Sequence, residues 1–219
     1  STRTTGVVYH SSLSRSHHEH FGFEASGGRI IPNGLQLERL RPIPETGAAV
    51  RQELSIQQDA LLVGHVARFH PMKDHASFLQ AAVWVAQQNP LVQFLIVGRE
   101  VSLDNPALSN IVPPSLLDRF TIIGERRDAQ RLMQGMDVLA MSSAWGEAFP
   151  NVLGEAMASG VPCVATDVGD SAHIVGESGI VVPPSDSEAL AHGLLQMLRK
   201  SPQERQALGQ AARERMETN

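Results

Sequence analysis

The sequence predicts an α/β fold built on a doubly wound parallel sheet, and two observations carry this prediction. From Ala60 onward, short apolar segments alternate with segments of helical periodicity. The apolar segments are hydrophobic at nearly every position, which is typical of parallel strands covered by helices on both faces. In such a sheet, ligands bind in the crevice beyond the carboxyl ends of the strands. We therefore expect the functional residues in the loops that follow the strands.

Six strands are expected in this part of the chain. They are the segments Ala60–Ala67, Val92–Val97, Phe120–Gly124, Asp137–Met141, Cys163–Thr166 and Ile180–Val182. Helices are expected at about Asp74–Gln88, near Ser115, near Ala129, and at Pro150–Ser159, Asp186–Arg199 and Pro202–Glu217. The helix that starts near Pro150 has the clearest ends, because proline suits a first helical turn and Gly160 followed by valine and proline is typical of a helix end.

The first 45 residues differ in composition from the rest. Short strands are expected at Gly6–Tyr9 and Arg29–Ile31, with a polar helix at Ser11–Phe21 between them. The segment Arg41–Gly47 contains two prolines and a glycine, which is typical of a linker. We therefore divide the chain into residues 1–45 and a larger domain of residues 46–219.

Composition excludes several classes of function. The chain has 219 residues, of which 42% are hydrophobic, and its formal net charge of −5 argues against nucleic-acid binding. The single cysteine, Cys163, lies in an apolar segment and is expected to be a core residue rather than a nucleophile. No segment resembles a signal peptide, and none approaches the ~20 apolar residues of a membrane span. We expect a cytoplasmic protein.

Two loops place cations beyond the strand ends. Arg68 and Lys73 flank a turn directly after the first strand, where an arginine and a lysine can bind a diphosphate by charge-assisted hydrogen bonds without a metal. The alternative is two solvated surface cations, and the position at the crevice favours binding. In the loop Gly124–Asp128, Arg126 either faces a ligand or belongs to the solvated start of a helix.

A third loop runs from Ser143 into the helix near Pro150. Asn151 and Glu155 share one face of that helix, and Glu147 lies in the loop before it. The free N–H groups of a first helical turn attract an anion, whereas carboxylates need hydroxyl donors. A sugar phosphate supplies both. Each carboxylate alone is an ordinary loop or surface residue, and it is their combination with Arg68 and Lys73 that indicates a site.

These motifs resemble those of family 4 glycosyltransferases, which are retaining enzymes of the GT-B fold with two facing Rossmann-like domains. Glu147 and Glu155 match the family's E-x7-E signature, and Arg68 and Lys73 match its Arg-x4-Lys element. Other segments fall at the expected intervals, namely Ile30–Gly34, Phe94–Gly98, Ile123–Asp128 and Gly179–Asp186. The resemblance implies a C-terminal, donor-binding Rossmann-like domain from Ala60 to about Leu198. It also implies that residues 1–45 are the tail of an N-terminal domain and the interdomain linker.

The resemblance implies a role for each catalytic candidate. Arg68 and Lys73 would hold the diphosphate of a nucleotide sugar and stabilise the charge on the leaving nucleotide, where other glycosyltransferases use a divalent metal. Glu147 would accept hydrogen bonds from the hydroxyls of the donor sugar, and Glu155 from those of the ribose. No metal or other cofactor is expected. The expected donor is a nucleotide-diphosphate sugar, with the UDP type favoured.

The remaining substrate-binding candidates surround these four. Backbone amides in the segment that contains Phe149, Pro150, Asn151 and Val152 would complete the phosphate site. The base would lie near Arg126 and the end of the strand at Gly98. The chain departs from the family pattern at two places near the site. Arg99-Glu100 replaces the frequent Asp-Gly. His173 stands where many members have a glutamate, so the role of that glutamate is not assigned to this chain.

The expected reaction is transfer of the sugar to an acceptor hydroxyl with retention of anomeric configuration, in glycan or polysaccharide biosynthesis. The acceptor, a glycan or a lipid-linked molecule, would be held by an N-terminal domain, so this chain alone is expected to bind nucleotide but to transfer sugar poorly or not at all. Membrane association would be peripheral. The alternatives are a non-catalytic nucleotide-sugar binding module, a GT-B nucleotide-sugar epimerase, a phosphorylase-like enzyme and an unrelated phosphate-binding domain.

Overall fold

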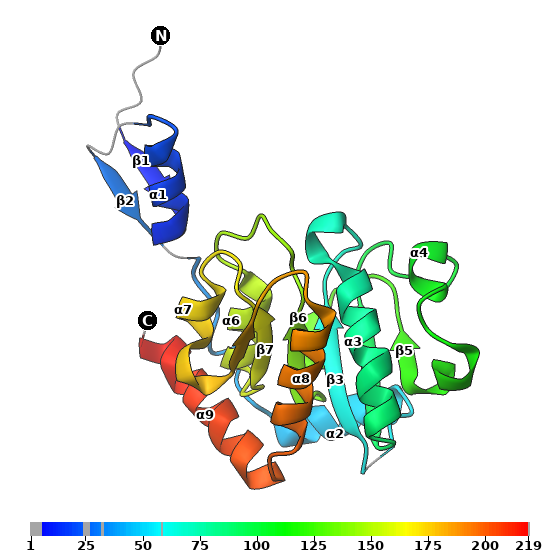
Figure 1. Cartoon of the computed structure of the whole chain (residues 1–219). Helices are drawn as coiled ribbons and strands as arrows, with labels where there is room; N and C mark the ends of the chain where they lie inside the picture. Colours follow the sequence, from blue (N-terminus) through cyan, green and yellow to red (C-terminus); the bar gives the residue numbers. More distant parts are fainter. Residues whose placement is uncertain (1–5, 24–26, 32, 58, 219) are drawn as a thin grey trace.

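The computed structural model describes residues 6–23, 27–31, 33–57 and 59–218. Its centre is a parallel sheet of six strands in the order β5-β4-β3-β6-β7-β8 (Figure 1). The strands are β3 (Leu61–Val66), β4 (Val92–Val97), β5 (Phe120–Ile122), β6 (Val138–Met141), β7 (Cys163–Thr166) and β8 (Ile180–Val182). The chain runs outward from β3 to β5, returns to β6 beside β3, and runs outward again to β8. This order is doubly wound, as the sequence predicts, and its switch point lies between β3 and β6.

Helices cover both faces of the sheet. On one face, α3 (His75–Gln88) packs against α8 (Ser187–Leu198), with α4 (Pro106–Ser109) beside α3. The other face carries α2 (Pro44–Glu53), α5 (Ala129–Met133), α6 (Asn151–Ala158), α7 (Ser171–Val175) and α9 (Pro202–Thr218). Three short 3-10 helices, η1 (Pro71–Lys73), η2 (Pro114–Arg119) and η3 (Gly176–Ser178), lie in the connections. None of the helices in the described ranges is long and apolar enough to cross a membrane.

Alternate strand residues fill two separate cores. In β4, Phe94 and Ile96 pack in the core beneath α3 and α8, whereas Leu95 and Val97 pack in the core beneath α5 and α6. Because both faces are covered, the strands are apolar at most positions, which explains the pattern in the sequence. Cys163 is 1% exposed, and burial raises the pKa of its thiol, so the expectation of a core cysteine is confirmed.

The expected linker at Arg41–Gly47 is helical from Pro44, because α2 begins there with proline in its first turn. The helix packs on α5, where a Cβ atom on Gly47 would lie 2.5 Å from the carbonyl oxygen of Gln134. Val50 is fully buried beside it. Proline therefore starts the helix and glycine allows its close packing on α5, and a boundary after residue 45 falls inside α2.

The N-terminal unit consists of β1 (Val7–Tyr9), α1 (Ser12–His20) and β2 (Gly28–Ile30), with β1 and β2 paired in parallel. It stands apart from the six-stranded domain (Figure 1). The two strands and the helix lie where the sequence predicts them, and Pro32 of the expected linker motif lies outside the described residues. After the linker, Asn33 Nδ2 donates to Asn151 Oδ1 at 2.8 Å and so connects this segment to α6.

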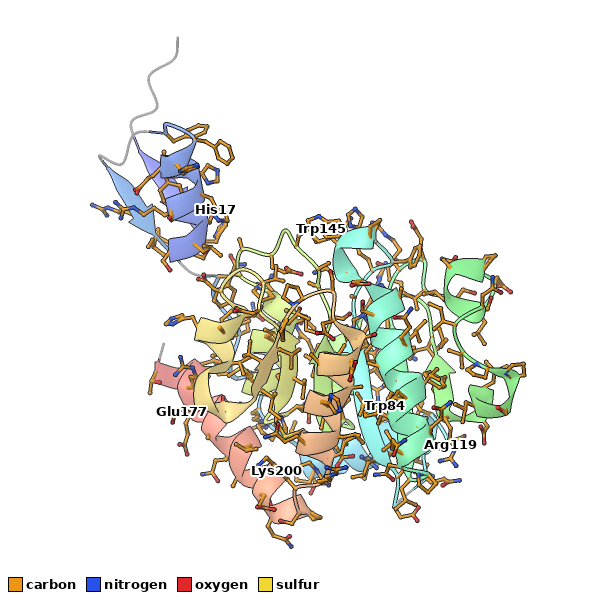
Figure 2. All side chains as sticks on the ribbon, viewed as in Figure 1. His17, Trp84, Arg119, Trp145, Glu177 and Lys200 are labelled. Carbon is orange, nitrogen blue, oxygen red and sulfur yellow. The ribbon has the colours of Figure 1, made fainter. Side chains whose placement is uncertain are left out.

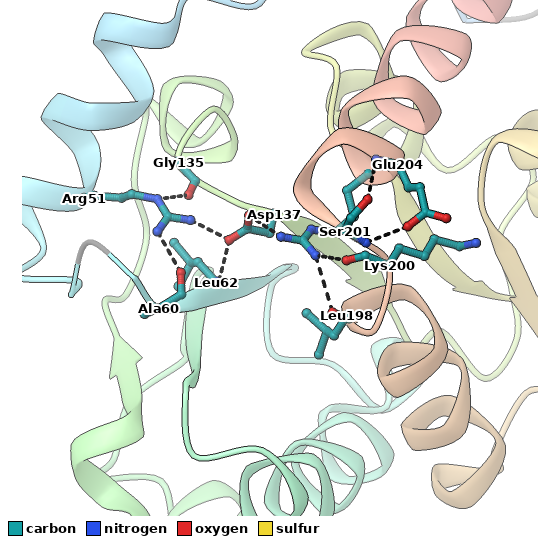
Figure 3. Close-up of polar contacts among 10 residues, drawn as sticks. Arg51, Ala60, Leu62, Gly135, Asp137, Leu198, Lys200, Ser201 and Glu204 are labelled. Atoms are coloured by element: carbon teal, nitrogen blue, oxygen red, sulfur yellow. Dashed lines mark hydrogen bonds and ion pairs between the residues drawn. The ribbon is translucent and has the colours of Figure 1, made fainter.

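A cluster of charged side chains lies at the amino ends of the strands (Figure 3). Asp137 Oδ2, just before β6, accepts from Arg51 Nη2 at 2.5 Å and from the Leu62 N–H at 2.8 Å. Arg205 of α9 is 7% exposed, and its Nη2 lies 3.6 Å from Asp137 Oδ1. One carboxylate therefore holds α2, the start of β3 and α9 together.

Replacement of Asp137 by alanine should lower the free energy of unfolding by about 2–3 kcal/mol, because two guanidinium groups and one backbone N–H lose their charged acceptor. The measurement is urea denaturation of the 219-residue chain. Asp118, whose side chain is 77% exposed, provides the control, and Asp118→Ala should change the value by less than about 0.5 kcal/mol. Equal effects of the two substitutions would contradict the role given to Asp137.

Two buried histidines flank the turn that contains Lys73. The rings of His65 in β3 and His75 in α3 lie 4.8 Å apart, and each residue is 2% exposed. His65 also stacks on Phe78, with ring centroids 4.4 Å apart. Burial is the main reason that the pKa of His75 falls to about 4 and that of His65 lies well below its usual range; the nearby charge of Lys73 lowers both further.

Acidification should therefore destabilise the protein through His75. The unfolded chain binds the proton at an ordinary pKa near 6.5, but the folded chain binds it only near pH 4, so stability is lost as the pH falls between these values. A His75→Phe variant should lose about 2 kcal/mol less than wild type between pH 7 and pH 5, measured by urea denaturation at each pH. A surface substitution, His17→Gln, should keep the wild-type pH dependence, and a His75→Phe curve parallel to that of wild type would contradict the assignment.

Candidate functional site

The loops after β3 and β6 meet at the switch point of the sheet. The β3 loop includes η1 and ends at Lys73, and the β6 loop runs from Ser142 to Pro150. The Ala144 N–H donates to the Met72 carbonyl at 2.8 Å. Ser142 Oγ lies 2.8 Å from the carbonyl oxygen of Lys73 and 3.1 Å from that of Asp74. The two loops are therefore joined through their backbones as well as through their side chains.

Lys73 and Glu147 form an ion pair between these loops. Lys73 Nζ donates to Glu147 Oε1, and Ser143 Oγ donates to the same oxygen at 2.6 Å. The side chains of Lys73 and Glu147 are 18% and 9% exposed. Among the residues that the structure describes, no donor contacts Glu147 Oε2. Within that part of the chain, the carboxylate is thus held through one oxygen.

Local backbone geometry sets the position of Lys73. Asp74, which follows it, adopts a left-handed conformation with φ of 45° and caps α3. Its carboxylate accepts from the Ser77 N–H at 3.1 Å and from Ser77 Oγ at 2.7 Å. The cap offsets the strain of a left-handed aspartate and turns the chain sharply from η1 into α3.

Arg68 lies earlier in the same loop, and its side chain is exposed. Within the described residues, it has no hydrogen-bond or ion-pair partner of the kind that Lys73 has in Glu147. The structure therefore brings Lys73 and Glu147 into contact but leaves Arg68 directed to solvent. A role for Arg68 at a diphosphate stays a prediction.

Gly98 is a point of close approach between strand ends. A Cβ atom there would lie 1.8 Å from the Ala67 carbonyl oxygen, so only glycine allows the end of β4 to approach the β3 loop this closely. The Gly98 N–H donates to the Gly124 carbonyl at 2.9 Å. Gly98 therefore shapes the floor of the crevice, and its predicted contact with a base stays a prediction.

The first turn of α6 follows Glu147 directly. The helix begins at Asn151, and Pro150 precedes it in an extended conformation instead of forming its first residue. Phe149 and Val152 are half-buried and Pro150 is buried, while Asn151 is exposed. The amides of Asn151 and Val152 have no acceptor within the helix, because a first turn has none. The start of a helix therefore lies close to Glu147 in the chain, and its binding of an anion stays a prediction.

Glu155 and Arg126 have partners within the described residues. Glu155, on the next turn of α6, accepts from Gln130 Nε2 at 3.0 Å. Arg126 binds Asp128 with Nε at 2.8 Å and Glu53 with Nη2 at 3.0 Å, which connects the β5 loop to α2. Its guanidinium thus has a structural function, and the predicted contacts of Glu155 with a ribose and of Arg126 with a base stay predictions.

The loop after β7 supports Glu147 from the other side. Thr166 Oγ1 donates to the Ser143 carbonyl at 2.7 Å, and the Asp170 N–H donates to the Ala148 carbonyl at 3.0 Å. Gly169 has φ of 62°, and a Cβ atom there would lie 2.4 Å from the Glu147 carbonyl oxygen. Sequence analysis missed Ser143, Thr166 and Gly169. The available signal was that Ser143 and Thr166 are hydroxyl residues at the ends of otherwise apolar strands.

Beyond Phe149, a cavity of about 500 Å³ separates the N-terminal unit and linker from α7 and α9. His173, which replaces the glutamate of the family pattern, is exposed and lines this cavity together with Asp170. Phe149, two residues after Glu147, also lines this cavity, whereas Lys73 and Glu147 themselves do not.

Comparisons with known proteins match most of the chain to one family. Residues 60–200 match the family model described as "Glycosyl transferases group 1". The putative glycosyltransferase EpsF of Bacillus subtilis (strain 168) is 33% identical over 142 residues, which cover 63% of this chain and 35% of that protein. UDP-Gal:alpha-D-GlcNAc-diphosphoundecaprenol alpha-1,3-galactosyltransferase of Escherichia coli is 25% identical over 77% of this chain and 44% of its own length. The chain thus spans less than half of either relative.

A solved structure shows the same fold. HepE of Anabaena, in complex with UDP-glucose, superposes with a TM-score of 0.86 at 24% identity, over 99% of this chain and 60% of that one. The fold is that of a Rossmann-like domain of GT-B glycosyltransferases, as the sequence predicts. The family match covers all six strands of the sheet and every loop of the candidate site. The chain therefore belongs to the glycosyl transferases group 1 family.

Proposed function

We propose that this chain is the donor-binding part of a retaining glycosyltransferase of family 4, which binds a nucleotide-diphosphate sugar and supports transfer of the sugar to an acceptor hydroxyl. The observation that carries the proposal is the Lys73–Glu147 pair beside the first turn of α6. A cation and free amides suit a diphosphate, while a fixed carboxylate suits sugar hydroxyls. The group that suits the diphosphate and the group that suits the sugar are therefore in direct contact with each other.

In the proposed complex, Lys73 and Arg68 contact the diphosphate together with the amides of Asn151 and Val152. During transfer, the bond from the anomeric carbon to the phosphate oxygen breaks and a bond to the acceptor oxygen forms, while the proton of the acceptor hydroxyl passes to the departing diphosphate. Negative charge grows on the leaving nucleotide, and cations that are already in place stabilise it without a metal ion. The anomeric configuration is retained, and no covalent nucleophile is assigned.

Glu147 accepts from the donor sugar through Oε2, and Glu155 exchanges Gln130 for the ribose hydroxyls. The base lies near Gly98 and Arg126. A uridine nucleotide is supported by the Escherichia coli relative, whose name specifies UDP-Gal, and by the UDP-glucose complex of HepE. The same relative acts on a diphosphoundecaprenol, which supports a lipid-linked acceptor, a role in polysaccharide biosynthesis and peripheral contact with the cytoplasmic face of a membrane.

The N-terminal unit supports a second domain in the working enzyme. Four of its apolar side chains are more than half exposed, namely Val8, Phe21, Phe23 and Ile31. Such a concentration of exposed apolar side chains marks a surface that packs against a partner. We assign this surface to the remainder of an acceptor-binding domain.

Replacement of Lys73 by alanine should abolish most of the thermal stabilisation by UDP, because the diphosphate loses its buried cation. The measurement is a thermal-shift series of the 219-residue chain with UDP, GDP and ADP, and UDP should give the largest shift for the wild type. The other lysine of the chain, Lys200, lies at the opposite end of the sheet (Figure 2) and provides the matched control. A Lys73→Ala shift equal to that of Lys200→Ala would remove Lys73 from the site.

The 219-residue chain alone should bind nucleotide but release little or no UDP from UDP-glucose in the presence of alkyl glycosides as acceptors. The reason is that the proposed acceptor site lies in another domain. Restoring that domain should restore acceptor-dependent release, which an assay of free UDP detects. Tight binding without turnover in the restored protein would favour a non-catalytic module, and UDP release that needs no acceptor would favour a nucleotide-sugar epimerase.

A further inference from the structure

We propose that Ser143 is a positioning residue for Glu147, and that it keeps the carboxylate aimed at the donor sugar when Lys73 turns to the diphosphate. The inference rests on the proposed function. Its basis is the 2.6 Å hydrogen bond from Ser143 Oγ to Glu147 Oε1, the oxygen that also contacts Lys73. Within the described residues, Glu147 Oε1 thus accepts from two donors, Lys73 and Ser143. A bound ligand competes for only one of them.

Lys73 has two competing partners once a donor is present. Its ammonium group carries one charge and three N–H donors, and a diphosphate offers it several anionic oxygens. Contact with the diphosphate weakens the hold of Lys73 on Glu147 Oε1. The Ser143 hydroxyl has no such alternative, because its other surroundings are protein and it is 1% exposed. The serine contact is therefore the one that persists in the complex.

The backbone around Ser143 is fixed on both sides. Thr166 Oγ1, in a residue that is 2% exposed, donates to the Ser143 carbonyl at 2.7 Å. On the neighbouring residues, Ser142 Oγ contacts the Lys73 carbonyl at 2.8 Å and the Ala144 N–H donates to the Met72 carbonyl at 2.8 Å. The hydroxyl of Ser143 is consequently held at a set position relative to both loops.

In this arrangement, the two oxygens of the Glu147 carboxylate have different roles. Oε1 keeps its hydrogen bond from Ser143, so the carboxylate keeps its orientation and Oε2, which has no donor among the described residues, is the oxygen assigned to a sugar hydroxyl. Without the serine hydroxyl, a Lys73 bound to phosphate would leave Glu147 free to rotate. The expected loss therefore falls on recognition of the sugar and not on recognition of the nucleotide.

The experiment compares UDP with UDP-glucose by calorimetric titration into the 219-residue chain and its variants. For wild type, UDP-glucose should bind more tightly than UDP. In Ser143→Ala, the affinity for UDP should stay within about twofold, whereas the extra affinity due to glucose should fall about tenfold, the usual effect of a lost hydrogen bond to a charged group. In Ser143→Cys, the side chain keeps its volume but the thiol is a weak donor, so the extra affinity due to glucose should fall in the same way. This variant serves as the test if the alanine variant does not fold.

Ser178→Ala is the matched control. Ser178 is also buried, at 6% exposure, and its hydroxyl donates to the Val175 carbonyl at 2.7 Å, away from the site. It should leave both affinities unchanged. An equal loss for UDP and UDP-glucose in the Ser143 variants would indicate general loosening of the loop and overturn the inference, as would an undiminished glucose contribution. If wild type binds neither compound, the proposed function itself fails and this inference falls with it.

Discussion

The contact between Lys73 and Glu147 is the interaction on which the rest of the site depends. It joins two loops that are far apart in sequence and that meet only because β3 and β6 are neighbours in the sheet. A lone buried carboxylate or ammonium group is costly, so each of these side chains stabilises the other in the absence of ligand. In the proposed complex, the same pair meets a molecule that carries anionic oxygens at one end and hydroxyls at the other. The same two side chains thus stabilise the loops and, in the proposed complex, contact the ligand.

Close backbone approaches make this contact possible. Gly98 lets the ends of β3 and β4 converge, and Gly169 lets the β7 loop pack against the backbone of Glu147. A Cβ atom would lie 1.8 Å from the Ala67 carbonyl oxygen at Gly98 and 2.4 Å from the Glu147 carbonyl oxygen at Gly169, so a side chain at either position would force the loops apart. Hydroxyl groups at the strand ends then fix the register of the loops, as Thr166 does for Ser143. The crevice is therefore shaped by small residues and its chemistry is supplied by a few charged ones.

Most of the sheet could be predicted from the sequence because its strands are buried on both faces and read as continuous apolar segments. Val92–Val97, Cys163–Thr166 and Ile180–Val182 have the predicted limits. The helix α2 could not be recognised in the same way, because proline at its start and Gly47 at its contact with α5 are also typical of a linker. Local composition does not distinguish a glycine that bends the chain from one that admits a neighbouring carbonyl group.

The candidate site was predictable in part for a related reason. Charged residues after apolar strands mark the crevice, and so Lys73 and Glu147 are found from sequence alone. Whether a particular cation faces the crevice depends on partners far away in the chain. Arg126 is engaged with Glu53 of α2, and Arg68 extends into solvent. The hydroxyl of Ser143 gives only an unspecific signal, because serine is common near strand ends and only the fold places it against Glu147.

The last helix adds a mechanical constraint. Arg213 of α9 donates to the carbonyl of Leu40 in the linker, at 3.4 Å, and also to the carbonyl of Ala158 at the end of α6. A single guanidinium thus joins the segment that leads from the N-terminal unit to the helix whose opposite end faces Glu147. If the N-terminal unit rotates about this segment, α6 must either move with it or lose its connection through Arg213.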